Sequence, residues 1–131
     1  MKITITIEAT KISPELRREI AAEESNNETL LVLAKDEDWT VRESVAENSN
    51  ASKEILTELA KDEDWRVRIA VAKNANTSAE SLSELAEDGV WNVRTVVAEN
   101  PNTSPEILSK LAKDDDEIVR EAAKENPNFK K

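Results

Sequence analysis

Apolar residues recur along the chain in two alternating patterns, each with helical spacing. Val41, Val45 and Ala46 follow an i, i+4, i+5 spacing, and Ile55 and Leu59 follow an i, i+4 spacing. Residues spaced in this way share one face of a helix, so each unit is predicted to contain two short helices. Neither helix can bury its apolar face alone. The pattern therefore predicts units that stack into an all-α solenoid with a continuous core.

The helix pair repeats with a step of 26 residues. The columns that do not change over four copies are Asp36, Asp62, Asp88 and Asp114; Val41, Val67, Val93 and Val119; Arg42, Arg68, Arg94 and Arg120; Asn48, Asn74, Asn100 and Asn126; and Asn50, Asn76, Asn102 and Asn128. Upstream, Leu16-Arg17 with Ile20-Ala21 fits a degenerate copy that is shifted by one residue. We therefore expect an N-terminal segment at residues 1–10 and one repeat domain at residues 11–131, with a degenerate first repeat at about 14–35 and a C-terminal cap.

The turns carry signals for where each helix starts and stops. Ser52 precedes one helix, and Asp38 is placed to cap the other, because short side chains with an oxygen accept hydrogen bonds from free N–H groups at a helix start. Segments such as Asn100-Pro101-Asn102 are expected to end the helix. Asn tolerates left-handed backbone and Pro stops helix propagation.

The repeat resembles known helical repeats in its residue pattern. A Val-Arg step with Asp six residues before the Arg is similar to the HEAT repeat. The fuller string Trp65-Arg66-Val67-Arg68-Ile69-Ala70-Val71-Ala72-Lys73-Asn74-Ala75-Asn76-Thr77-Ser78 resembles the leucine-rich repeat variant family more closely. The resemblance covers roughly residues 28–128. It implies a right-handed superhelix of paired helical segments with no β-sheet between them.

Composition narrows the classes of function. The 131 residues include 18 Lys and Arg against 28 Asp and Glu, which gives a net charge of −10, and they include no Cys, His or Tyr. Thiolate and histidine metal sites, disulfides and Ser-His-Asp triads are excluded because their residues are missing. We expect no cofactor, no metal and no catalysis. The negative charge argues against direct contact with nucleic acid or an anionic membrane. With no long apolar stretch or signal peptide, we expect a cytoplasmic protein.

The Asp and Arg columns are interpreted as a structural ladder. Stacked units bring each Asp near the Arg of its own or the adjacent repeat, where the two side chains form hydrogen bonds. The Trp column is interpreted as packing between repeats, since it recurs with the regularity of a core. Acidic residues beside the Trp column form an acidic edge that either receives a basic partner or only favours helix starts and solubility. The acidic edge consists of Asp36, Glu37, Asp38, Asp62, Glu63, Asp64, Asp114, Asp115 and Asp116.

The variable positions of the Val-Arg helix are the best candidates for partner binding. Solenoids bind along one face, and side chains on that face differ between repeats. If this helix lines the inner curve, the face residues form a groove; the alternative is that they are unconstrained solvated positions. The candidate residues are Thr40, Glu43, Glu47, Arg66, Ile69, Lys73, Asn92, Thr95 and Glu99.

The first residues show a different pattern. Ile3, Ile5 and Ile7 alternate with polar residues, as in a β-strand. A single strand has no partner in an all-helical solenoid. It pairs with the same strand of a second molecule in a homodimer, adds to the sheet of another protein, or lies on the first repeat as an apolar cap.

Two hypotheses for function follow from these observations. The favoured one is a non-catalytic adaptor or scaffold that binds another protein along one solenoid face. The alternative is an inhibitor that imitates nucleic acid, in which acidic runs at each repeat occupy the basic cleft of a nucleic-acid-binding protein or enzyme. For the charge itself, solubility is a sufficient explanation.

Overall fold

The computed structural model describes residues 12–131, and these residues contain nine helices and no strand. Long helices of nine or ten residues alternate with short helices of seven. The long helices are α2 (Pro14–Glu23), α4 (Trp39–Glu47), α6 (Trp65–Lys73), α8 (Trp91–Glu99) and α10 (Glu117–Glu125). The short helices are α3 (Asn27–Leu33), α5 (Lys53–Leu59), α7 (Ala79–Leu85) and α9 (Pro105–Leu111). The predicted all-α repeat solenoid is confirmed.

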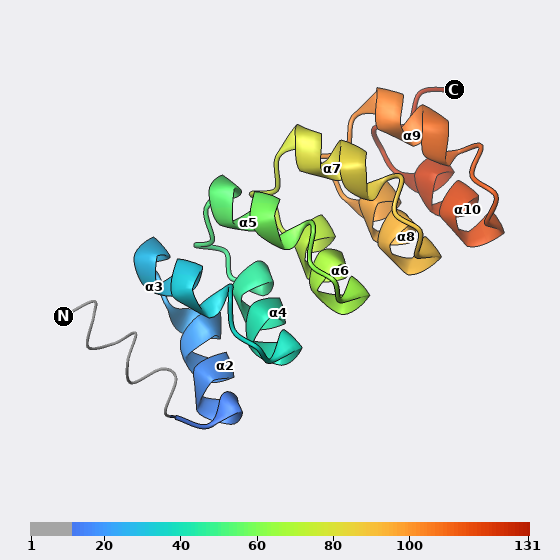
Figure 1. Ribbon diagram of the computed structural model, residues 1–131. Coiled ribbons are helices and arrows are strands. Elements are labelled where there is room, and N and C mark those ends of the chain that lie inside the picture. The colour runs from blue at the N-terminus through green and yellow to red at the C-terminus, as the bar shows by residue number, and fades with distance from the viewer. Residues whose placement is uncertain (1–11) are drawn as a thin grey trace.

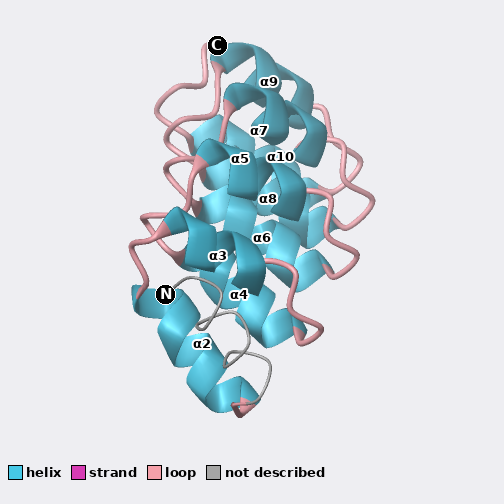
Figure 2. Ribbon diagram, turned by 60° about the vertical axis from the view of Figure 1, so that its left-hand side comes forward, coloured by secondary structure: helices cyan, strands magenta, loops and turns pink. Residues whose placement is uncertain are grey.

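The helices form two layers that run side by side along the molecule (Figures 1 and 2). Each long helix packs on the long helices before and after it, and these contacts are the most extensive between helices of the described chain. Each short helix contacts the two long helices that flank it in sequence, so it covers the junction between two repeats. The long helices therefore form a continuous row with one side against the short helices and the other side not covered by any described helix.

Cap residues determine where most of the helices begin. The Ser52 hydroxyl accepts a hydrogen bond from the Ile55 N–H at 3.2 Å, and the Asp38 carboxylate accepts one from the Thr40 N–H at 2.8 Å. Each bond satisfies an N–H that has no partner inside its helix. Helix α8 differs, because Val90 stands at its cap and provides no side-chain acceptor. The predicted cap roles of Ser52 and Asp38 are confirmed.

The core lies between the two layers and is built from the recurring apolar columns. Val41, Val67, Val93 and Val119 are fully buried, and so are Leu30, Leu56 and Leu108. Thr77 and Thr103 are also buried. Their hydroxyls donate to the Val71 and Val97 carbonyl oxygens, at 2.6 Å each, so burial leaves no polar atom unsatisfied.

The interpretation of the Trp column as packing between repeats is wrong for two of its three members. Trp65 and Trp91 are each 40% exposed, and only Trp39 packs partly against the core. Trp65, the first residue of its helix, is partly exposed, while Val67, the third, is fully buried in the core. A constant interval in the sequence shows that residues occupy equivalent positions in the repeats, but it does not show whether those positions are buried or exposed.

The prediction that the Asn segments end the long helices is confirmed, but the expected left-handed backbone there is wrong. No described residue has positive φ, and the backbone is extended at all four caps, namely Asn48, Asn74, Asn100 and Asn126. The Asn side chains have a different task, described below. The expected N-terminal strand and the homodimer through it fall on residues 1–10, outside the described residues. No described helix has the length and apolar character that a membrane span requires.

Candidate partner-binding face

The uncovered side of the long-helix row is the candidate site, and we call it the long-helix face. Its side chains come from four positions in each long helix, which are spaced i, i+3, i+4 and i+7 and so share one stripe. The face combines the nine residues predicted from the sequence with a further column and with the C-terminal helix. In α4 to α10 it consists of Thr40, Glu43, Ser44 and Glu47; Arg66, Ile69, Ala70 and Lys73; Asn92, Thr95, Val96 and Glu99; and Ile118, Glu121, Ala122 and Glu125.

One column of this face was not predicted from the sequence, namely Ser44, Ala70, Val96 and Ala122. These small side chains are half-buried, apart from Ala70 at 2% exposure, and they lie between the outer columns of the face. Small apolar residues look like core in a periodicity analysis. The available signal was Ser44, a polar residue that stands one position after Glu43 and four after Thr40.

Charge on the long-helix face changes sign twice along the row, from negative on α4 to positive on α6 and back to negative on α8 and α10. Helix α4 carries Glu43 and Glu47, helix α6 carries Arg66 and Lys73, and helix α8 carries Glu99. Burial raises the pKa of Glu43, and the Glu47 charge acts in the same direction, while the charges of Arg66 and Lys73 oppose the shift. The α4 and α6 groups therefore lie close enough to influence one another.

Arg66 is held in one position on this face. Its guanidinium donates to the Asp64 carboxylate through Nε at 3.0 Å and Nη2 at 2.9 Å, and its carbon lies 3.6 Å from the centroid of the Trp39 ring. Stacking on an aromatic ring is favourable for a guanidinium. Arg66 therefore links the first turn of α6 to that of α4, and its cation occupies a fixed place.

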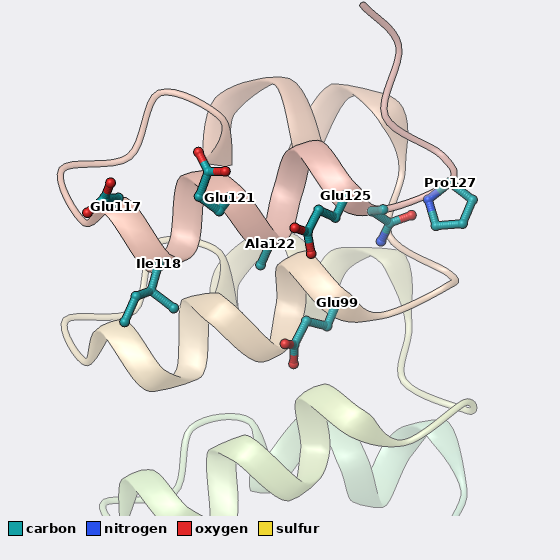
Figure 3. A pocket seen from close by; sticks show the side chains of 8 residues that line it. Glu99, Glu117, Ile118, Glu121, Ala122, Glu125 and Pro127 are labelled. Atoms are coloured by element: carbon teal, nitrogen blue, oxygen red, sulfur yellow. The ribbon is translucent and has the colours of Figure 1, made fainter.

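A shallow hollow of about 490 Å³ lies between α8 and α10 at the C-terminal end of the face. Ile118 and Ala122 project from α10 toward α8, and Glu125 and Glu99 lie near one end (Figure 3). Ile118 is 55% exposed, the most exposed large apolar side chain in the described chain. The hollow thus has an apolar floor and acidic borders.

The Asp and Arg columns form a ladder between repeats, and the predicted structural role is confirmed. Four Arg side chains donate through Nε and Nη2 to the two carboxylate oxygens of the Asp in the following repeat, at distances between 2.7 and 3.2 Å. Arg120, in the last repeat, donates to the carbonyl oxygens of Asp114 and Asp115. The pairs are Arg17–Asp36, Arg42–Asp62, Arg68–Asp88 and Arg94–Asp114. The sequence left open whether the Asp belongs to the same or the adjacent repeat, and the adjacent repeat supplies it.

Intramolecular contacts occupy most of the predicted acidic edge. Asp36, Asp62 and Asp114 are the ladder carboxylates, whose side chains are between 7% and 11% exposed. Asp38, Asp64 and Asp116 accept from the N–H groups of the following helices as caps. The three remaining members are exposed, namely Glu37, Glu63 and Asp115. In the copy that begins at Asp88, Gly89 and Val90 stand where the other three copies have acids, so the edge is interrupted.

The first Asn of each pair joins repeats at the opposite end of the long helices. The Asn74 amide donates to the carbonyl oxygens of Ala46 and Asn48 at 2.8 and 3.0 Å, and its own oxygen accepts from the Asn76 N–H at 2.8 Å. The last carbonyl groups of a helix have no N–H donor within that helix, and the Asn amide of the next repeat supplies the donor. The amide does this from an extended backbone, which explains why no left-handed residue is needed.

Comparison with known proteins supports the sequence resemblance. The family model described as leucine rich repeat variant matches residues 39–64, and the model described as leucine rich repeat variant domain matches residues 68–127. These matches of 26 and 60 residues cover 86 of the 131 residues together and fall on the repeats that share the ladder. No curated protein and no solved structure is significantly similar to the chain. The chain belongs to the leucine-rich repeat variant family.

Proposed function

We propose that this protein is a non-catalytic interaction module that binds another protein along the long-helix face. The observation that carries the proposal is a contrast between columns. The buried Val41 and Leu56 columns and the ladder columns stay the same or nearly so over the four repeats, while the outward columns that begin at Thr40, Glu43 and Glu47 change in charge. Solenoid proteins recognise specific partners in this way, because their scaffold is the same in every repeat while their binding surface varies.

The chemistry of the described residues favours binding over catalysis. Paired groups for acid and base catalysis need different environments within one pocket. The recurring carboxylates are instead engaged by Arg side chains or helix N–H groups in the same way in each repeat. The hollow between α8 and α10 is open and bordered by Glu side chains, with no cationic or amide side chain placed opposite them except Asn126, whose amide is used by Ala98 and Asn100.

The alternative, an acidic mimic of nucleic acid, has less support. It depends on a regular row of available carboxylates at the edge of the solenoid. Of the nine residues assigned to that edge, six carry out ladder or cap roles, and the copy that begins at Asp88 lacks two of the acids. The remaining charge has a sufficient explanation in solubility.

Site-specific photocrosslinking tests the proposal. A photoreactive amino acid replaces Thr95 on the long-helix face or Glu80 on helix α7 of the opposite layer, and the chain is irradiated in lysate of its source cells. We expect a defined protein adduct from position 95 and none from position 80. The adduct should persist after nuclease treatment. Equal adducts from both positions, or an adduct restricted to position 80, would contradict the proposal.

A further inference from the structure

The long-helix face carries a charge register that a partner must match. Going from α4 to α10, the outward charges are negative on α4 at Glu43 and Glu47, positive on α6 at Arg66 and Lys73, and negative again at the α8–α10 hollow. Like charges placed opposite one another cost free energy, whereas opposite charges guide association and fix the register. The sign changes therefore select among partners.

The spacing of the register fits an extended peptide segment. Packed helices lie about 8–10 Å apart, and an extended chain advances about 3.3 Å per residue, so one repeat corresponds to about three residues of a partner. In the middle column Ser44, Val96 and Ala122 are short and half-buried, which allows a backbone to approach at α4, α8 and α10. Ala70 is only 2% exposed, so at α6 the backbone would lie over the neighbouring side chains of the face. About ten residues would then reach from α4 to α10.

The positive part of the register on α6 and the negative part at the α8–α10 hollow differ in their surroundings. On α6, Arg66 is fixed by Asp64 and Trp39, and Lys73 lies on the same helix face seven residues later. At the C-terminal end, the exposed Ile118 and Ala122 provide an apolar floor beside Glu121 and Glu125. A Lys or Arg side chain suits this end, because its aliphatic stem covers apolar surface while its charged group reaches the acids.

Resting on the proposed function, we propose that the partner segment is an extended stretch of protein with a carboxylate about a third of the way along and a Lys or Arg residue at each end. The carboxylate lies against α6, one cationic side chain lies in the α8–α10 hollow, and the other lies against α4. Charge complementarity with the three parts of the face defines this occupant.

The test uses synthetic peptides of about ten residues. The matching peptide carries Lys at both ends, Glu about a third of the way along, Val about two-thirds along and Ser elsewhere; its reversed sequence covers the opposite chain direction. A control peptide exchanges Lys and Glu. Titration of the ¹⁵N-labelled protein is followed by NMR. We expect shifts at Lys73, Ile118 and Ala122 with one of the matching peptides and none with the control peptide.

Charge reversal in the protein makes the test specific. Replacing Glu121→Lys and Glu125→Lys together should weaken binding of the matching peptide about tenfold, since two surface charge pairs become repulsive. The same replacement at Glu54→Lys and Glu58→Lys has the same i, i+4 spacing on α5 in the opposite layer and should leave binding unchanged. The Lys73→Glu variant should bind more tightly to a peptide in which Lys replaces the single Glu than to the matching peptide.

Two results would overturn the inference. One is equal binding of the matching and control peptides. The other is an equal loss with the α5 and α10 variants, which would indicate attraction by overall charge. If both peptides fail to bind while photocrosslinking at position 95 succeeds, the charge register is wrong and the proposed function stands. If photocrosslinking fails as well, the proposed function falls too.

Discussion

Arg42 donates from Nε and Nη2 to both carboxylate oxygens of Asp62, one repeat further along, at 2.7 and 3.1 Å. Its third nitrogen, Nη1, donates to the Asp36 carbonyl oxygen of its own repeat at 2.7 Å. One guanidinium thus holds the loop before its own helix and the loop before the next. The side chains are only 11% and 7% exposed, so solvent screens the pair less than a surface ion pair.

Removing one ladder carboxylate should destabilise the whole stack. Asp62→Ala leaves the half-buried Arg42 charge without its partner and removes the acceptor of the Asp64 N–H. We expect a loss of about 3 kcal/mol in the free energy of unfolding, measured with urea. Glu63→Ala, at the exposed neighbouring position, should change it by less than about 0.5 kcal/mol. Similar losses for both variants would show that the ladder contributes little.

The Asn columns should divide into a strong and a weak class. Asn74→Ala leaves the carbonyl groups of Ala46 and Asn48 without a donor in a buried position, at an expected cost of about 3 kcal/mol. Asn102→Ala removes one exposed bond, to the Ala75 carbonyl oxygen, and should cost about 1 kcal/mol. Thermal unfolding of the two variants gives the comparison. The reverse order would contradict the assigned roles.

Exposure predicts a small effect of losing a large aromatic side chain. Trp65 is 40% exposed, so Trp65→Ala should reduce the free energy of unfolding by about 1–2 kcal/mol, below the range for a buried aromatic residue. Leu82→Ala, which creates a cavity in the core, should cost about 2–5 kcal/mol although it removes fewer atoms. Denaturant unfolding decides between them. A greater loss at Trp65 would place its ring inside the stack.

Acid should reduce the contribution of the Arg94–Asp114 pair to the free energy of unfolding. Burial tends to raise the pKa of Asp114, but hydrogen bonds from Arg94 and the Asp116 N–H outweigh it and lower that pKa overall. An Asp in the unfolded chain has a pKa near ~3.9, so just below that pH the unfolded chain binds more protons than the folded one. The stabilisation is present above about pH 4 and is lost as pH falls through the folded pKa.

The measurement compares wild type with Asp114→Asn between about pH 7 and pH 2. The difference in free energy of unfolding should be greatest near neutral pH and should shrink in acid. Asp115→Asn removes the same charge from an exposed neighbour and serves as the control. A difference that stays constant with pH would mean that the Asp114 carboxylate does not contribute through its charge.

Periodicity was sufficient to predict the fold because core packing imposes it. Val41 and Leu56 recur with their neighbours since each repeat must bury the same apolar face. Periodicity could not show that Trp65 is exposed and Val67 is buried. Both residue types recur every 26 residues, so their columns look the same in the sequence. Direction within the stack, and not regularity, decides burial.

The candidate site was predictable to a similar extent. The columns of Thr40, Glu43 and Glu47 were predicted as a binding face because their residues vary between repeats, and their side chains are half-buried or exposed in the structure. The Ser44 column was missed, since a small side chain satisfies both core and surface requirements. The role of Asn74 was missed for another reason. Its partners lie 26 and 28 residues earlier in the chain, and only the stacked arrangement brings them together.

The ladder makes the repeats interchangeable parts. Asp62 and Asp88 occupy equivalent places, so deletion of residues 62–87, which removes α6 and α7, would bring Asp88 to the position where Arg42 finds its partner. Asn100 would likewise replace Asn74. Duplication or deletion of one repeat in the gene therefore needs no new type of contact between neighbouring repeats. The recognition surface then changes by one helix at a time, and selection acts on single units while the scaffold remains intact.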